Sequence, residues 1–136
     1  MKALLCFALL LAVSSATFYP SWKLIEPSNI FKVTAVYAQS NPQVGQMNIL
    51  TVCGNALFDT EVRSFAYQVG QGNEIWSLGN VDLTQQSIPN GHGYCFFYKY
   101  VVPSQAQAAH GYSVYLVLEN SITNVASVQV DFSIKA

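Results

Sequence analysis

The chain has 136 residues, enough for one domain, and 51% of them are hydrophobic whereas only 10% are charged. The charged residues are scattered, form no runs and leave a formal net charge of −1. This pattern argues against a phosphate-backbone footprint, so we expect no nucleic-acid partner, and it also argues against a polybasic membrane clamp.

The N-terminus has the pattern of a secretory signal peptide. Met1-Lys2 is a short charged segment, Ala3–Val13 is apolar, and Ser14-Ser15-Ala16 supplies the small residues that a signal peptidase reads. The apolar run is too short to span a bilayer, which argues against an N-terminal anchor helix. We therefore expect cleavage after Ala16, a mature domain of residues 17–136, and secretion or delivery to the endosomal or lysosomal lumen.

Two cysteines remain in the mature chain, Cys53 and Cys95, because Cys6 lies in the signal peptide. The oxidising secretory route favours a disulfide between them. Two unpaired thiols, each packed as a small hydrophobic side chain, are the alternative.

The mature chain alternates apolar and polar residues with a period of two, which predicts strands. An extended segment, Thr17–Ser28, comes first, and Gly79–Gly93 is the most irregular part of the chain. No segment has a helical pattern. The expected strands, in chain order, are Asn29–Gln39, Gln46–Cys53, Thr60–Val69, Glu74–Leu78, Tyr94–Val102, Tyr112–Glu119 and Ala126–Ile134.

Short strands at regular spacing predict an all-β protein, an immunoglobulin-like antiparallel β-sandwich. A true immunoglobulin domain is rejected, because Gly93 stands two residues before Cys95, where such a domain has the tyrosine of its tyrosine corner.

The chain offers few parts for catalysis. Its two histidines, His92 and His110, both fall in expected loops, and no serine has the surroundings of a nucleophile. No paired spacing of metal ligands is visible either. We expect no enzyme, no metal site and no cofactor; a loop-based hydrolase that uses either histidine is the remote alternative.

The aromatic content is the unusual feature, with eight Phe, eight Tyr and two Trp. Residues 94–102 carry aromatic side chains on both faces of one expected strand. Such rings either fill the space between two sheets or, if the sheets splay, line a cavity. Composition alone favours the filled core.

From about Asn41 onward the sequence resembles the ML family of lipid-recognition domains. This family includes phosphatidylglycerol/phosphatidylinositol transfer proteins, the Niemann–Pick type C2 sterol carrier and the ganglioside activator. The segments that carry the resemblance are Pro42–Gln46, Val62–Val69, Asp82-Leu83, Val102–Ser104 with Gly111–Val114, and Asp131–Ile134. The chain departs from the family at Thr84, where a cysteine is common after Asp-Leu, and it lacks the family's larger set of cysteines.

The resemblance implies a monomeric lipid-binding and lipid-transfer protein that holds a phospholipid or sterol between its two sheets and contacts membranes transiently. It implies a mouth at the segments Thr84–Gly93 and Ser104–His110. The alternative is a closed sandwich that serves as an adhesion or structural module and takes no ligand. The residues that we expect to line the lipid cavity, chosen by face and bulk, are Phe65, Tyr67, Trp76, Phe97, Tyr98, Tyr100, Val114, Leu116, Val130 and Phe132.

Overall fold

The computed structural model describes residues 17–135; the expected signal peptide, residues 1–16, lies outside the described residues. The elements are the strands β1 (Ser21–Glu26), β2 (Phe31–Ala38), β3 (Met47–Ala56), β4 (Thr60–Gln71), β5 (Glu74–Ile88), β6 (Gly93–Val101), β7 (Gly111–Glu119) and β8 (Asn124–Ser133), and the short helix α2 (Gln105–Ala109). The strands are consistent with the alternation of the sequence, and the all-β prediction is confirmed.

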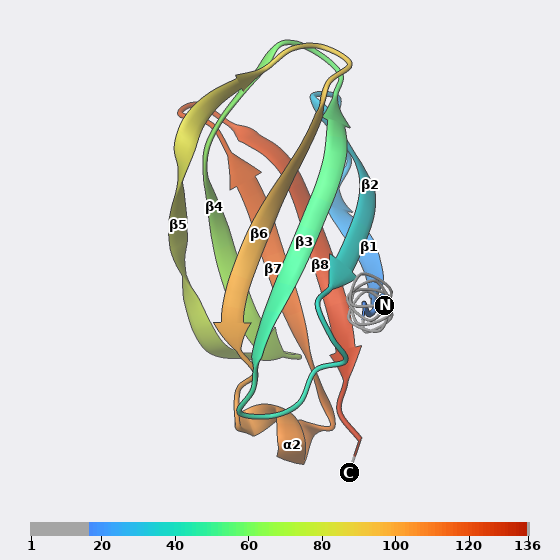
Figure 1. Cartoon of the computed structure of the whole chain (residues 1–136). Coiled ribbons are helices and arrows are strands. Elements are labelled where there is room, and N and C mark those ends of the chain that lie inside the picture. Colours follow the sequence, from blue (N-terminus) through green and yellow to red (C-terminus); the bar gives the residue numbers. More distant parts are fainter. Residues whose placement is uncertain (1–16, 136) are drawn as a thin grey trace, which may run out of the picture.

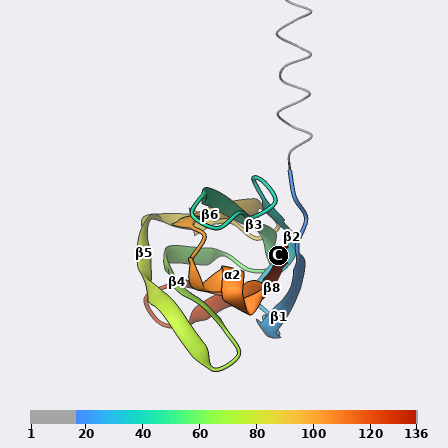
Figure 2. The ribbon, with the colours of Figure 1, turned by 90° about the horizontal axis from the view of Figure 1, so that it is seen from below.

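The strands form two antiparallel sheets that pack face to face. One sheet has five strands in the order β1-β8-β7-β4-β5, and the other has three in the order β2-β3-β6. In Figure 1 the three-stranded sheet lies in front of the five-stranded sheet. The view along the strands in Figure 2 shows β5 standing at one side, between the two layers. The predicted antiparallel sandwich is confirmed.

The period-two pattern decides what lies between the sheets. On β6, Phe96, Tyr98 and Tyr100 are buried, whereas Phe97 and Lys99 on the opposite face are exposed. Strands β4, β7 and β8 likewise turn alternate apolar side chains inward, and the buried side chains from both sheets form one continuous core.

The two sides of the sandwich differ in how the sheets are joined. On one side Phe18 exchanges two backbone hydrogen bonds with Ala38 beside the three-stranded sheet, and its ring stacks on Phe132 of the five-stranded sheet. On the other side β5 and β6 are edge strands of different sheets and do not pair with each other. The sheets are therefore tied together along one side, whereas on the other side β5 and β6 are connected by the turn at residues 89–92 and are otherwise joined by side-chain packing.

The expected disulfide is present between Cys53 and Cys95. The two residues are direct cross-strand partners on β3 and β6, with Cα atoms 4.1 Å apart. The bond therefore links two strands of one sheet on its outer face and does not cross the core, unlike the inter-sheet bond of an immunoglobulin domain.

Two segments differ from their sequence-based description. Strand β5 continues to Ile88, although residues 79–93 were expected to be irregular, because its backbone pairs with β4 and this pairing does not require apolar side chains. The absence of helix was also a wrong expectation, since Gln105–Ala109 forms one short helical turn that ends at His110 with a positive φ of 59°. These two segments lead to opposite ends of the sandwich in Figure 1, so they cannot form one mouth.

We predict that the variant C53A/C95A folds but is less stable than the wild type. The disulfide closes a separation of 42 residues, for which the chain-entropy model gives about 4 kcal/mol. Urea unfolding would measure the difference as a lower midpoint with an unchanged slope. Reduced wild-type protein should match the double variant, and equal midpoints for the oxidised wild type and the variant would contradict the prediction.

Candidate functional site

A continuous series of aromatic rings runs through the space between the sheets. The closest neighbours are Tyr67 and Tyr98, with ring centroids 4.8 Å apart, and two pairs at 4.9 Å, Tyr98 with Tyr100 and Tyr112 with Phe132. We call this series the ring column. Its members are Phe18, Phe132, Tyr112, Tyr100, Tyr98, Tyr67, Phe65 and Phe96.

The rings come from both sheets, so the column holds the two layers together. Tyr98 of β6 stacks on Tyr67 of β4, and the edge of Tyr100 meets the ring of Tyr112 on β7. Stacked and edge-to-face pairs contribute about 0.5–1.5 kcal/mol each beyond the burial of their surface.

One polar contact lies inside this apolar space. The hydroxyl groups of Tyr100 and Tyr112 share a buried hydrogen bond of 2.7 Å. Asn48 is buried beside Tyr100 on the neighbouring strand, and its own amide donates to the Ser40 carbonyl oxygen. Each phenol hydroxyl thus has a partner, as a buried polar group requires.

Burial raises the pKa of the tyrosines in the column. Loss of solvent is the largest cause for Tyr98, Tyr100 and Tyr112, because an ionised phenolate would stand among apolar rings. For Tyr98 and Tyr100 the neighbouring tyrosines raise the pKa further.

The column reaches the surface where β5 and β6 face each other. Tyr67, Val81, Leu83 and Tyr94 are only partly buried there, although all four pack against the core. Gly79 lies directly opposite Tyr67 on β5, and a Cβ atom there would meet the Tyr67 hydroxyl oxygen at 2.7 Å. The missing side chain makes room for the ring. We call these four residues the open edge.

The structure distributes the ten predicted cavity residues over four places. Trp76 is half-buried on β5 and packs against the core, and Tyr67 belongs to the open edge. Phe97 lies on the outer face of the three-stranded sheet and is 55% exposed, so its placement between the sheets was wrong. Its neighbours Phe96 and Tyr98 point inward, and the alternation of a strand puts Phe97 on the other side. The remaining seven are buried between the sheets: Phe65, Tyr98, Tyr100, Val114, Leu116, Val130 and Phe132.

Sequence reasoning missed several side chains that belong to the same region. Tyr112 shares a face with Val114 on β7, which alternation alone could have indicated. Phe96 and Tyr94 share a face with Tyr98 on β6. Val81 was not included among the cavity residues, because its segment was described as irregular.

In the present conformation the interior is filled by side chains. Of the hollows found among residues 17–135, one of about 660 Å³ lies between Phe18–Ser21, the β2–β3 loop and the end of β8, and another of about 330 Å³ lies on the outer face of the five-stranded sheet. None of the hollows described is lined by a buried ring of the column.

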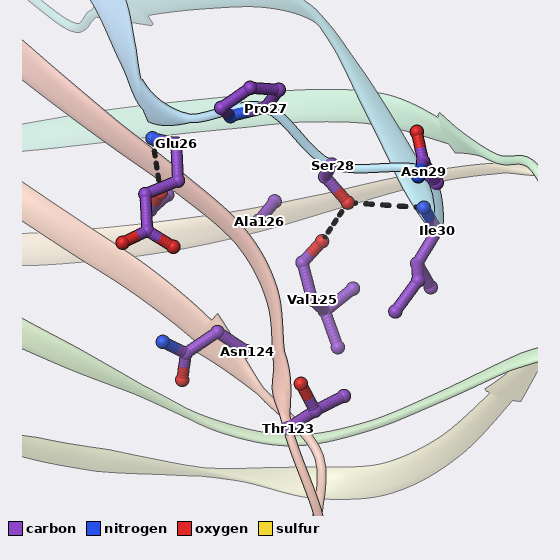
Figure 3. Close-up of a pocket in the computed structure, with 10 residues that line it drawn as sticks. Glu26, Pro27, Ser28, Asn29, Ile30, Thr123, Asn124, Val125 and Ala126 are labelled. Atoms are coloured by element: carbon purple, nitrogen blue, oxygen red, sulfur yellow. Dashed lines mark hydrogen bonds between the residues drawn. The ribbon is translucent and has the colours of Figure 1, made fainter.

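A further hollow, of about 350 Å³, lies at one end of the sandwich between the β1–β2 turn and the start of β8 (Figure 3). Ser28 organises it: its hydroxyl donates to the Val125 carbonyl oxygen at 2.6 Å and accepts from the Ile30 amide at 3.1 Å. These bonds fix the turn between β1 and β2.

The described residues were also searched for a metal site, for paired histidines and for a membrane-spanning helix. No group of three or more His, Cys, Asp or Glu side chains within residues 17–135 could hold a metal ion. His92 follows β5 and His110 follows α2, so they belong to opposite ends of the sandwich (Figure 1). No helix of the described part of the chain is long and apolar enough to cross a membrane.

No model of a known protein family matches the sequence, and no curated protein matches it. Solved structures do match the fold. A Niemann-Pick type C2 protein from the Japanese carpenter ant is similar with a TM-score of 0.56 and 9% identity, over 85% of this chain and 99% of that one. The C-terminal domain of wzt is similar with a TM-score of 0.59 and 9% identity, over 88% of this chain and 81% of that one. At sequence identities this low, the structural similarity establishes a shared fold alone.

We predict that alkaline pH destabilises the protein through the buried tyrosines. Unfolded tyrosine has a pKa of about 10, and the folded pKa is higher at Tyr98, Tyr100 and Tyr112. Below pH ~10 these phenols are protonated in both states, so their stabilising effect is complete. Above that pH the unfolded state loses protons first, and the free energy of unfolding falls.

The measurement is tyrosinate absorbance followed together with near-ultraviolet circular dichroism. Tyr98, Tyr100 and Tyr112 should ionise only together with the loss of the circular dichroism signal. Their ionisation with an unchanged dichroism signal would refute the buried column.

Proposed function

We propose that this protein binds a phospholipid or sterol between its two sheets and carries it between membranes. Three things support the proposal: the fold shared with a Niemann-Pick type C2 protein, the sequence resemblance to the ML family, and the apolar interior. The observation that carries it is the open edge, where this interior meets solvent between two strands that do not pair.

The open edge gives a route for an acyl chain. Parting β5 from β6 breaks ring contacts such as that between Tyr67 and Tyr98 but no backbone ladder. The opposite side stays joined by Phe18, which bonds to Ala38 and stacks on Phe132. The sandwich can therefore hinge on its tied side and open on the other, away from the turn at residues 89–92 that connects β5 to β6.

The energetics are favourable because the incoming chain replaces one apolar contact with another. Burying an acyl chain contributes about 0.8 kcal/mol per CH₂ group. Separating a few stacked pairs costs about 0.5–1.5 kcal/mol each. A chain of ordinary length thus offsets the loss of the ring contacts that it displaces.

The proposed protein is a monomer and needs neither a reaction nor a cofactor. Its disulfide is typical of extracellular and lumenal proteins, and we propose secretion or an endosomal or lysosomal location. Cargo is taken up during transient contact with a membrane.

The filled interior favours a second candidate, a closed sandwich that acts as an adhesion or structural module. In that case the rings of the column are ordinary core and no ligand enters. The two candidates differ in one measurable property, the uptake of lipid.

We predict that the variant V81W takes up a fluorescent acyl lipid at least about ten-fold more slowly than the wild type, a change of ~1.4 kcal/mol in the barrier. Val81 pairs with Phe65 on the inner face of β5 and is partly exposed at the open edge. An indole there occupies the space that the chain must enter, and overpacking of this kind costs about 1–3 kcal/mol.

The matched control is N80W. Asn80 is the preceding residue of the same strand, is exposed, and pairs with Ala66 on the outer face. This control should take up lipid at the wild-type rate. No uptake by wild-type protein would favour the closed module, and equal slowing by V81W and N80W would exclude entry at the open edge.

A further inference from the structure

We propose that the outer face of the three-stranded sheet docks the protein on an anionic lipid bilayer. The inference deepens the proposed carrier function and rests on it for its biological purpose. The docking itself is a separate property that can be measured without cargo.

Several large apolar side chains on the outer face of β2, β3 and β6 are exposed among the described residues. Cross-strand register places Thr51 between Tyr37 and Phe97 in one row, and Met47 beside Val101 in another. Met47 is 61% exposed, Phe97 55% and Val101 56%. Exposed apolar side chains gathered in this way mark a contact surface.

The surface is also hollowed. A hollow of about 440 Å³ lies in its middle, and its lining includes Tyr37, Ile49, Phe97 and Lys99. The ring of Tyr19, which comes from the N-terminal segment, lies 6.2 Å from that of Tyr37 and extends the aromatic area. Rings with a polar tip favour the boundary between lipid headgroups and acyl chains.

Charge selects the kind of membrane. The charged residues of the three-stranded sheet are Lys32 and Lys99, both exposed and both basic. The five-stranded sheet has the opposite balance. Its charged residues are Glu26, Glu61, Glu74, Asp82, Glu119 and Asp131, with Lys23 and Arg63. An anionic surface would therefore attract the three-stranded sheet and repel the other.

The position of this face suits the delivery of cargo. Strand β6 is both the edge of the apolar face and one border of the open edge. Its alternation gives Phe97, Lys99 and Val101 to the bilayer while Tyr94 and Tyr98 face the interior. A lipid would thus pass from the docked surface into the sandwich around a single strand.

Two lysines are fewer than the four to eight of a polybasic lipid-binding cluster, so the docking should be weak and reversible. That is what a carrier that must leave the membrane requires. The contact should also weaken as salt is added, because screening acts on exposed charges.

The test is co-sedimentation of the wild-type protein with vesicles of phosphatidylcholine, with or without phosphatidylglycerol. The wild type should bind the anionic vesicles more strongly. Each lysine near a charged surface contributes roughly a five-fold change in binding, so K32Q/K99Q should bind about 25-fold more weakly. The variant F97S/V101S should lose binding to both kinds of vesicle.

The matched controls lie on the other sheet: Lys23→Gln on β1 and Leu78→Ser on β5, where Leu78 is 66% exposed. They should bind as the wild type does. The docking face would be refuted if the wild type bound neutral and anionic vesicles equally. It would also be refuted if the control variants lost as much binding as K32Q/K99Q and F97S/V101S. A wild-type dimer that F97S/V101S turns into a monomer would refute it as well, because a second copy would then cover the face.

A cargo measurement separates this inference from the proposed function. Lipid supplied from cyclodextrin needs no membrane, so K32Q/K99Q should take it up as the wild type does. Wild-type protein that docks with the expected variant pattern but takes up no lipid would refute the carrier function and leave the docking face standing. Wild-type protein that takes up lipid but binds no vesicles would refute the docking face and leave the carrier function standing.

Discussion

The stacking of Tyr98 between Tyr67 and Tyr100 is the contact on which the rest of the molecule depends. It joins an edge strand of the small sheet to the large sheet at the side where no backbone ladder connects them. The proposed lipid uptake concerns that place: how firmly rings hold the sheets together, and whether a lipid can take their place. On the opposite side Phe18 provides the fixed joint that such an opening needs.

The fold class followed from the sequence because period-two alternation is a local property, and it survives wherever one face of a strand is buried. The length of β5 did not follow from it. Residues such as Gln86 and Ser87 carry no apolar signal, yet they lie on an edge strand whose backbone is held by β4. The short helix was missed for a similar reason, since one turn is too short for a helical period to show.

Most of the residues expected to face the interior do so, and the misplacement of Phe97 has a physical cause. Both faces of β6 carry aromatic residues, so alternation shows that Phe97 and Tyr98 are on opposite sides but not which one is inside. Only the arrangement of the second sheet decides that. The hydrogen bond between Tyr100 and Tyr112 depends in the same way on how two sheets face each other. The exposed Phe97 then belongs to a different surface, beside Lys99 and Val101.

If the ring column gives way to a lipid, native mass spectrometry of protein from a eukaryotic secretory host will detect that lipid. We expect one lipid per monomer, released by organic extraction and identified as a phospholipid or sterol. The opposite result is protein that carries no lipid and that also fails to take up fluorescent phospholipid and sterol. The rings between the sheets would then be a permanent core, and the protein would be a closed sandwich.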